Sequence, residues 1–238
     1  MAQTKGHPAP TAELIAFLFD TVPDEALASE LAAWMGDVPW FRAFVDAHRD
    51  KVRKKLRTAA DAAGRRDVRA ELLVARLLLA DRRMELTFEP YGSAKGGPDF
   101  GVTMRGQSPF NLEVTRLRSA ADGAHVLGQL LTKLHQLPPS VASAVLVAAD
   151  LDSAQVVDLP TIVRQVRARA DAKDEAFFTS RGFGSARHFY QRFLRLGGAF
   201  VFSESAPSAS RATLWTNPSA RIALPARAAR ASLDLLRG

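Results

Sequence analysis

Two neighbouring stretches decide how this chain is interpreted: Gly96-Gly97-Pro98-Asp99-Phe100 and Phe110-Asn111-Leu112-Glu113-Val114-Thr115. Asp99 follows a Gly-Gly-Pro bend and opens a short apolar run, and Glu113 lies inside the next apolar run. Successive strand residues alternate between two faces, so Glu113 and Thr115 are expected to share one face. A buried carboxylate without a partner costs several kcal/mol, so Glu113 should bind either a metal ion or a basic side chain.

The pattern around these stretches predicts an α/β fold. A helix is expected over Asp67–Asp81, where apolar residues recur at helical spacing. A change to extended patterning then predicts three strands, and a nearly continuous apolar run predicts a strand that is buried on both faces. Strands joined through helices imply a mixed central sheet flanked by helices. The expected elements after the first helix are strands Glu85–Glu89, Phe100–Met104 and Phe110–Leu117, helix Ala120–Leu137, strand Val141–Ala149, helices Leu159–Phe178 and Ala186–Leu196, strands Ala199–Ser203 and Ala212–Thr216, and helix Pro225–Leu236.

The N-terminal part of the chain predicts helices only. Short amphipathic helices are expected over Thr11–Phe19 and Asp24–Met35, with Asp24 as a cap, and a longer helix over Trp40–Ala63 before a turn at Gly64. We therefore expect an N-terminal helical segment over residues 1–66 and an α/β domain over residues 67–238. The expected core of the helical segment is Trp34, Trp40, Phe41, Phe44 and Val45.

Composition limits the classes of protein to be considered. The 238 residues include 32 Lys and Arg against 25 Asp and Glu, a net charge of +7 that suits a polyanionic partner but also fits a solvated basic surface. The absence of cysteine excludes disulfides and thiolate zinc sites, and the five His residues form no i, i+4 pair. The first ten residues lack the apolar core of a signal peptide, and no apolar run reaches the roughly 20 residues that span a bilayer. These features predict a cytoplasmic protein without a membrane partner.

The order helix, three strands, helix, strand, with Pro98-Asp99 and a later Glu113, resembles the restriction-endonuclease-like core of the PD-(D/E)XK nuclease superfamily. The resemblance covers about Asp67 to Ala149. It implies that Asp99 and Glu113 hold Mg²⁺ or Mn²⁺, that an acidic residue of the preceding helix, here Glu71, assists them, and that the substrate is DNA.

The chain departs from the family pattern at one position. Active members carry a lysine two residues after the glutamate, and Thr115 stands there. Arg116 is expected on the opposite strand face unless a bulge intervenes. In some members the following helix supplies a Gln or a relocated Lys, which makes Gln129 and Lys133 candidates, with the loop residue Lys95 as a further one. Each helix residue could equally belong to a solvated helix face.

Basic residues before the first strand predict contacts with nucleic-acid phosphates. The set is Lys51, Arg53, Lys54, Lys55 and Arg57, with Arg116 added from the third strand. Two functions remain open from the sequence: a metal-dependent DNA nuclease with Asp99, Glu113, Thr115, Gln129 and Lys133 at its catalytic site, or an inactive module of the same fold. The inactive module would bind nucleic acid or a protein partner. A homodimer is compatible with either function.

Overall fold

The chain forms two compact units, which meet in sequence between Arg82 and Arg83. The boundary expected between residues 66 and 67 falls inside helix α5 (Ala62–Leu78). We describe each unit by itself. The computed structural model describes residues 9–21, 23–59, 61–92, 96–117, 123–149, 157–204 and 212–238.

In the described residues of unit 1, the regular secondary structure is entirely helical. Two of its helices begin at aspartate caps: the Asp24 side chain accepts from the Leu27 backbone N at 3.1 Å, and Asp61 accepts from Gly64 N at 2.7 Å. The expected cap at Asp24 is therefore confirmed. The helices are α1 (Thr11–Phe19), α2 (Glu25–Asp37), α3 (Pro39–Ala47), α4 (Arg49–Thr58) and α5 (Ala62–Leu78).

Three expectations for unit 1 were wrong. The single long helix over Trp40–Ala63 is divided at His48, whose φ of −118° and ψ of 16° are not helical. Gly64 lies in the first turn of α5, because the Asp61 cap starts that helix earlier. Trp40 is 53% exposed, whereas the other four expected core residues of this segment are buried.

Unit 2 is built on a mixed six-stranded sheet. The strand order follows the chain, β1-β2-β3-β4-β5-β6. The first three strands form an antiparallel meander, β4 and β5 run parallel to β3, and β6 is antiparallel to β5. The expected α/β class with a mixed sheet is therefore confirmed. The strands are β1 (Met84–Phe88), β2 (Phe100–Met104), β3 (Phe110–Arg116), β4 (Ser143–Ala149), β5 (Leu196–Ser203) and β6 (Ala212–Thr216).

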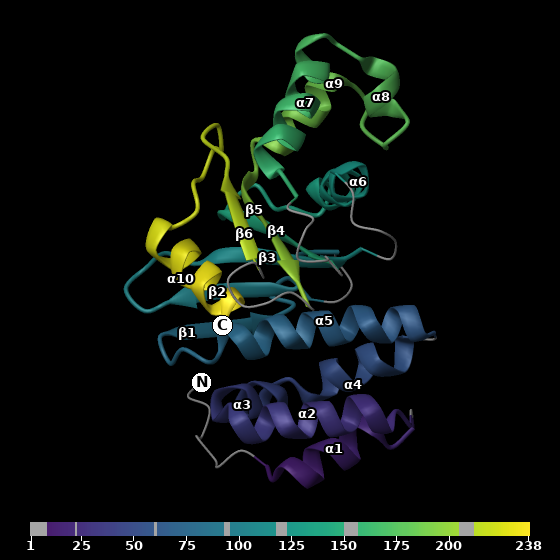
Figure 1. The fold of residues 1–238 in the computed structure, drawn as a ribbon, viewed down its shortest axis with the longest axis vertical. Helices are drawn as coiled ribbons and strands as arrows, with labels where there is room; N and C mark the ends of the chain where they lie inside the picture. Colours follow the sequence, from purple (N-terminus) through teal and green to yellow (C-terminus); the bar gives the residue numbers. More distant parts are fainter. Residues whose placement is uncertain are drawn as a thin grey trace. The chain divides into compact units, whose positions relative to one another are not determined.

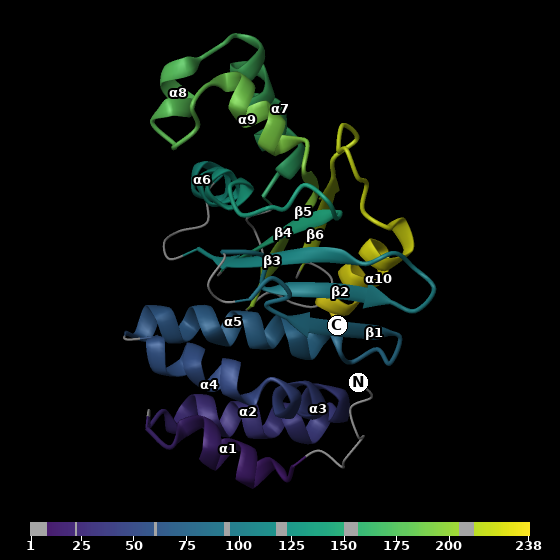
Figure 2. The same cartoon turned by 180° about the vertical axis from the view of Figure 1, so that it is seen from behind.

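Helices flank this sheet, with α6 and α10 on opposite sides of it in both views (Figures 1 and 2). The expected single helix over Leu159–Phe178 was wrong, because Lys173 adopts a left-handed φ of 54° and Asp174 caps a new helix. Residues 120–122 of the expected helix before β4 lie outside the described residues. The helices are α6 (Gly123–Leu134), α7 (Leu159–Asp171), α8 (Glu175–Thr179), α9 (Ala186–Phe193) and α10 (Ala226–Arg237).

One hydrophobic cluster of unit 2 lies between the helices α6, α7 and α9 and one face of the sheet. Odd-numbered residues of β4 and β5, including Val145, Val147 and Val201, belong to this cluster with Val126 and Leu130 of α6. All seven residues of β4 are buried, as its apolar run predicted. Because Glu113 pairs with Val145 in the parallel ladder, α6 covers the same face of β3 that carries Glu113. None of the helices in the described ranges is both long and apolar enough to cross a membrane.

Candidate active site

The antiparallel pairing of β2 with β3 positions Asp99. The register joins Phe100 to Leu112, and its continuation by one residue places Asp99 opposite Glu113. Opposed residues of an antiparallel pair project to the same face, so the two carboxylates share a face. The Val114 backbone N donates to Asp99 Oδ2 at 2.9 Å, which fixes the aspartate side chain against β3.

Glu113 is held by a lysine from the helix above it. Lys133 Nζ lies 2.5 Å from Glu113 Oε1, and the two side chains are 19% and 4% exposed, respectively. The ammonium group therefore supplies the positive charge that a carboxylate at this depth requires. Of the candidates for a basic group near the glutamate, the structure brings Lys133 to it.

A second contact joins the same two elements. Thr115 Oγ1 donates to Gln129 Oε1 at 3.1 Å. Four helical residues advance about 6 Å, and two strand residues advance about 6.7 Å, so one turn of α6 spans the two side chains of β3. Four of the residues expected at a catalytic site, Glu113, Thr115, Gln129 and Lys133, therefore meet as two pairs between β3 and α6.

A neutral polar network beside these pairs was not anticipated from the sequence. Asn111 Nδ2 donates to Tyr91 Oη at 3.2 Å and to Ser143 Oγ at 3.4 Å, although Asn111 is 3% exposed. Tyr91 also lines a small hollow of about 70 Å³ with Glu89 and Asp99. The sequence signal was the strand alternation itself, which places Asn111 on the face of Glu113.

The donors at the site are compatible with the expected magnesium ion. Carboxylate oxygens are the ligands that Mg²⁺ prefers, and they are supplied by Asp99, which directly precedes β2, and by Glu113 of the adjacent strand β3. Within the described ranges, no set of three or more His, Asp or Glu side chains comes together to hold a metal ion. A metal at this site would therefore depend on Asp99 and Glu113, with water completing its coordination.

The other predicted residues of the metal site are distributed differently. Glu71 lies on α5 in unit 1, where Lys55 Nζ is 2.5 Å from its Oε2. Arg116 donates from Nη1 to the Leu117 carbonyl oxygen at 3.2 Å. Lys95 lies outside the described residues. The assistance expected from Glu71 therefore stays a prediction.

The basic residues of α4 differ in their availability to a polyanion. Arg53 is paired with Asp20, and its guanidinium lies 4.6 Å from the centre of the Phe17 ring. Lys54 and Arg57 are exposed, and with Arg53 they line a hollow of about 370 Å³ along α4. Lys51 is half-buried on the same helix. Of the predicted phosphate contacts on α4, Lys54 and Arg57 are the most accessible.

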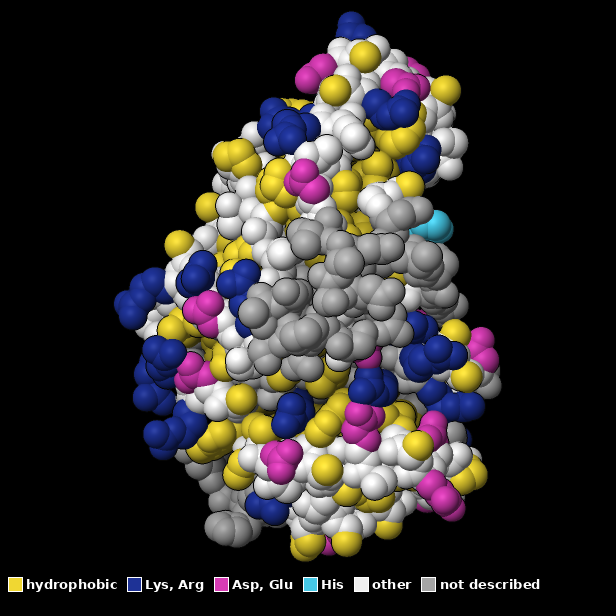
Figure 3. Space-filling view, in the orientation of Figure 1, with side chains coloured by type: hydrophobic (Ala, Val, Ile, Leu, Met, Phe, Trp, Pro, Cys, Tyr) yellow, Lys and Arg dark blue, Asp and Glu magenta, His cyan; other side chains and the backbone are white. Residues whose placement is uncertain are grey.

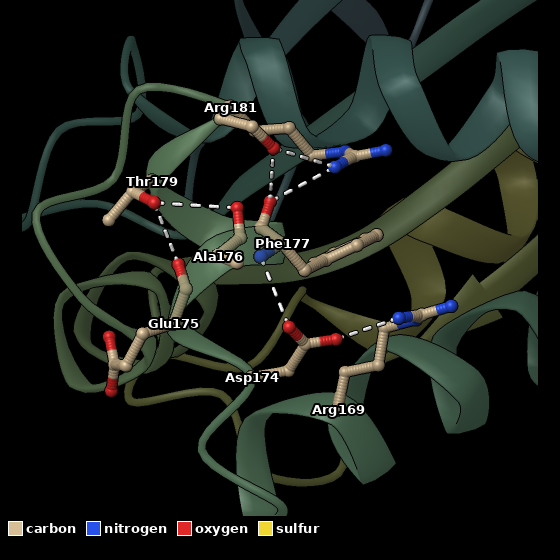
Figure 4. Close-up of polar contacts among 8 residues, drawn as sticks. Arg169, Asp174, Glu175, Ala176, Phe177, Thr179 and Arg181 are labelled. Atoms are coloured by element: carbon tan, nitrogen blue, oxygen red, sulfur yellow. Dashed lines mark hydrogen bonds and ion pairs between the residues drawn. The ribbon is translucent and has the colours of Figure 1, made fainter.

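Unit 2 has basic surface of its own: Figure 3 shows Lys and Arg side chains over α7 and over α10. Beside α8, the Phe177 ring lies between the Arg169 and Arg181 guanidinium groups, 4.6 Å and 3.8 Å from its centre (Figure 4). Asp174 accepts from Arg169 Nη1 at 2.7 Å, and this hydrogen bond, followed by that from the Phe177 backbone N, lowers the pKa of Asp174. These contacts join the end of α7 to α8 and to the turn that follows α8.

Comparison with known proteins gives no relative to set beside this geometry: no protein-family model, no curated protein and no solved structure matches the chain.

Proposed function

We propose that the protein is a metal-dependent nuclease that hydrolyses phosphodiester bonds in DNA, with Asp99 and Glu113 as metal ligands. The observation that carries the proposal is the 2.5 Å contact between Lys133 and Glu113, which brings a lysine to the glutamate from α6. Thr115 occupies the position of the lysine in the PD-(D/E)XK pattern, so a relocated Lys133 answers the main objection to that resemblance.

The chain order of unit 2 supports the same proposal. The antiparallel meander β1-β2-β3 is followed by α6 and by β4, which is parallel to β3. The proposal takes this order as that of a restriction-endonuclease-like core. In it, Asp99 directly precedes β2 and Glu113 lies on the neighbouring strand β3, 14 residues later.

Each residue of the site has a distinct role in the proposed reaction. When bound, Mg²⁺ would supply a Lewis acid that lowers the pKa of water and offsets phosphate charge. Asp99 and Glu113 would hold it through their carboxylates. The Lys133 ammonium would orient the attacking water and stabilise charge that develops on the phosphate. Gln129 and Thr115, by their mutual hydrogen bond, would hold the α6 turn that carries Lys133.

The test is cleavage of single-stranded, duplex and branched DNA by the purified full chain in Mg²⁺, in Mn²⁺ and in EDTA. Wild-type protein should cleave only with metal, and Glu113→Gln and Lys133→Met should each lose cleavage by at least about 100-fold, the usual effect of removing such a group. Lys173→Met is the matched control, because Lys173 is an exposed lysine of the same unit and should leave the rate unchanged. Equal cleavage by wild type and Glu113→Gln would refute the proposal.

A non-catalytic, nucleic-acid-binding module is the second candidate. It is favoured by the same contact, because a lysine and a glutamate that neutralise one another suffice as a structural ion pair. Its signature is DNA binding that weakens steeply with salt, together with no cleavage under any metal condition. Absence of both cleavage and DNA binding at low salt would leave a protein partner as the remaining alternative.

A further inference from the structure

Three arginines of unit 2 lie together outside the candidate active site, and we refer to Arg192, Arg195 and Arg221 as the arginine cluster. Arg192 is in the last turn of α9, and Arg195 directly precedes β5. Arg221 follows β6, and its backbone N donates to the Leu194 carbonyl oxygen at 2.8 Å. Backbone geometry therefore holds Arg221 against the short connection that carries the other two arginines.

Two side chains of the cluster make polar contacts with a backbone carbonyl group and a histidine ring. Arg195 Nη1 donates to the Leu137 carbonyl oxygen at 3.2 Å, and Arg192 Nε lies 3.3 Å from His188 Nε2. Within the described part of the chain, no carboxylate forms an ion pair with any of the three arginines. By contrast, Lys133, Arg169 and Arg230 of the same unit each lie within ion-pair distance of an acidic side chain.

Their proximity has an electrostatic cost. Burial lowers the pKa of Arg195, and the charges of Arg192 and Arg221 lower it further. A cation in the last turn of a helix is favoured by the helix dipole, but this accounts for Arg192 alone. Three guanidinium groups that repel one another are stabilised when an anion binds between them, and phosphate is the anion that guanidinium groups match best.

The cluster lies at the end of the sheet where the parallel strands begin. Leu196, next to Arg195, is paired with Ser143, and Ser143 is paired with Asn111, two residues before Glu113. Arg195 and Glu113 are separated by two strand spacings across the sheet and by three to four residues along the strands. The backbones of the two residues therefore lie roughly 15 Å apart. Arg195 also contacts Leu137, which follows α6 in the chain. Lys133 lies in the last turn of α6, so the cluster is connected to the end of the helix that carries Lys133.

We propose that the arginine cluster binds the backbone phosphates of a nucleic-acid strand, a few nucleotides away from the phosphate that lies at Glu113 and Lys133. The inference rests on the proposed function for its choice of nucleic acid as the partner. It does not require that the bound strand is cut. The cluster contributes sequence-independent affinity, because guanidinium contacts to phosphate do not read base edges.

The experiment measures binding of the full chain to a fluorescein-labelled duplex and to its single strand by anisotropy, in EDTA and over a series of salt concentrations. The test variant is Arg192→Gln with Arg221→Gln, which leaves Arg195 and the Arg221 backbone contact in place. The charge-matched control is Arg164→Gln with Arg230→Gln, at exposed positions on α7 and α10. Thermal unfolding of each protein is recorded in parallel.

The test variant should bind about tenfold more weakly at low salt, and its slope of log affinity against log salt should be smaller by about 1 to 2. Its melting temperature should equal or exceed that of the wild type, because like charges have been removed. The control pair should keep the wild-type slope. A loss of binding with an unchanged or raised melting temperature separates a ligand site from a structural role.

Three results would overturn the inference: equal affinities of test variant and wild type, an equal loss in the control pair, or no binding of either nucleic acid by the wild type. Inorganic phosphate is added in a separate series, and a rise in melting temperature with phosphate but no nucleic-acid binding would assign the cluster to free phosphate instead. Because binding is measured without metal, absence of cleavage would refute the proposed function and leave this inference standing.

Discussion

Replacement of Lys133 by methionine gives the most direct measure of how Glu113 is stabilised. The change keeps the length of the side chain and removes the ammonium group that lies 2.5 Å from Glu113 Oε1. Removing one partner of a buried ion pair costs about 3–5 kcal/mol, because the remaining charge loses its compensation. Glu113 is only 3% exposed, so water can replace little of that compensation.

Protonation of the glutamate sets an upper limit to this cost. An ordinary glutamate pKa is near 4.3, so placing a proton on such a group costs about 3.7 kcal/mol at pH 7 and about 1 kcal/mol at pH 5. The destabilisation by Lys133→Met should therefore be about 3–4 kcal/mol at pH 7 and should fall to about 1 kcal/mol at pH 5. The sign follows from linkage: a carboxyl group that takes up a proton in the folded variant loses stability as pH rises.

The assay is chemical unfolding followed by tryptophan fluorescence at both pH values. Trp215 of β6 reports on unit 2, so Trp34→Phe and Trp40→Phe in the background remove the signals of unit 1. In a unit of this size, about 3.5 kcal/mol corresponds to a fall in melting temperature of roughly 7–14 °C. Lys173→Met is the matched control and should change stability by less than about 0.5 kcal/mol. A Lys133→Met deficit that is below about 1 kcal/mol at pH 7, or equal at the two pH values, would refute the reasoning.

Two further predictions concern unit 2. Gly198→Ala should cost about 1–3 kcal/mol or more, because a Cβ there would lie 2.7 Å from Leu224 Cδ1 and 2.8 Å from the Trp215 carbonyl oxygen. Gly128→Ala in α6 meets nothing within 4 Å and should stabilise by about 0.5–1 kcal/mol; unfolding curves that rank the two variants the other way would contradict the packing argument. Asp174→Asn should keep the α8 cap and remove the carboxylate charge. The pKa of the Asp174 carboxyl group is lowered mainly by the hydrogen bond from Arg169 and then by that from the Phe177 backbone N. The stability that the Asp174 carboxylate contributes is present above pH 3.8 and is lost as pH falls through its lowered pKa. The loss of stability on acidification should therefore be smaller in Asp174→Asn than in the wild type. Superimposable curves of stability against pH would show that the Asp174 charge does not affect stability.

Some strand ends of unit 2 could be predicted because Gly or Pro lies beside them, as before β2 and β3, but Gly197 and Gly198 lie inside β5, which begins at Leu196 and not at the predicted Ala199. Phe100–Met104 and Ala212–Thr216 were predicted at both ends, and the buried character of β4 followed from its apolar run. The helix breaks at His48 and Lys173 were missed, because neither residue has the intrinsic preference of Gly or Pro for such positions. A local sequence pattern does not predict a helix break that is determined by the packing of neighbouring helices.

The candidate site was predictable in its parts and less so in its pairings. Strand alternation placed Glu113 and Thr115 on one face, and helical spacing placed Gln129 and Lys133 on one stripe. Which member of the stripe meets which strand residue depends on how far α6 is displaced along β3. Side-chain volumes in the cluster under α6 determine that displacement, and they act between residues distant in sequence.

The two contacts between α6 and β3 also limit the substitutions that the chain tolerates during evolution. A slip of α6 by one turn in one direction would set Lys133 against Thr115 and Leu137 against Glu113, and in the other direction it would set Gln129 against Glu113, so the observed alignment is the one that gives Glu113 a cationic partner. Positions 113 and 133 should consequently be inherited as a pair, as should positions 115 and 129. In a chain with lysine at position 115, β3 would itself carry the ammonium group, and position 133 would no longer need to be lysine. One substitution would then be enough to move the basic group from α6 to β3.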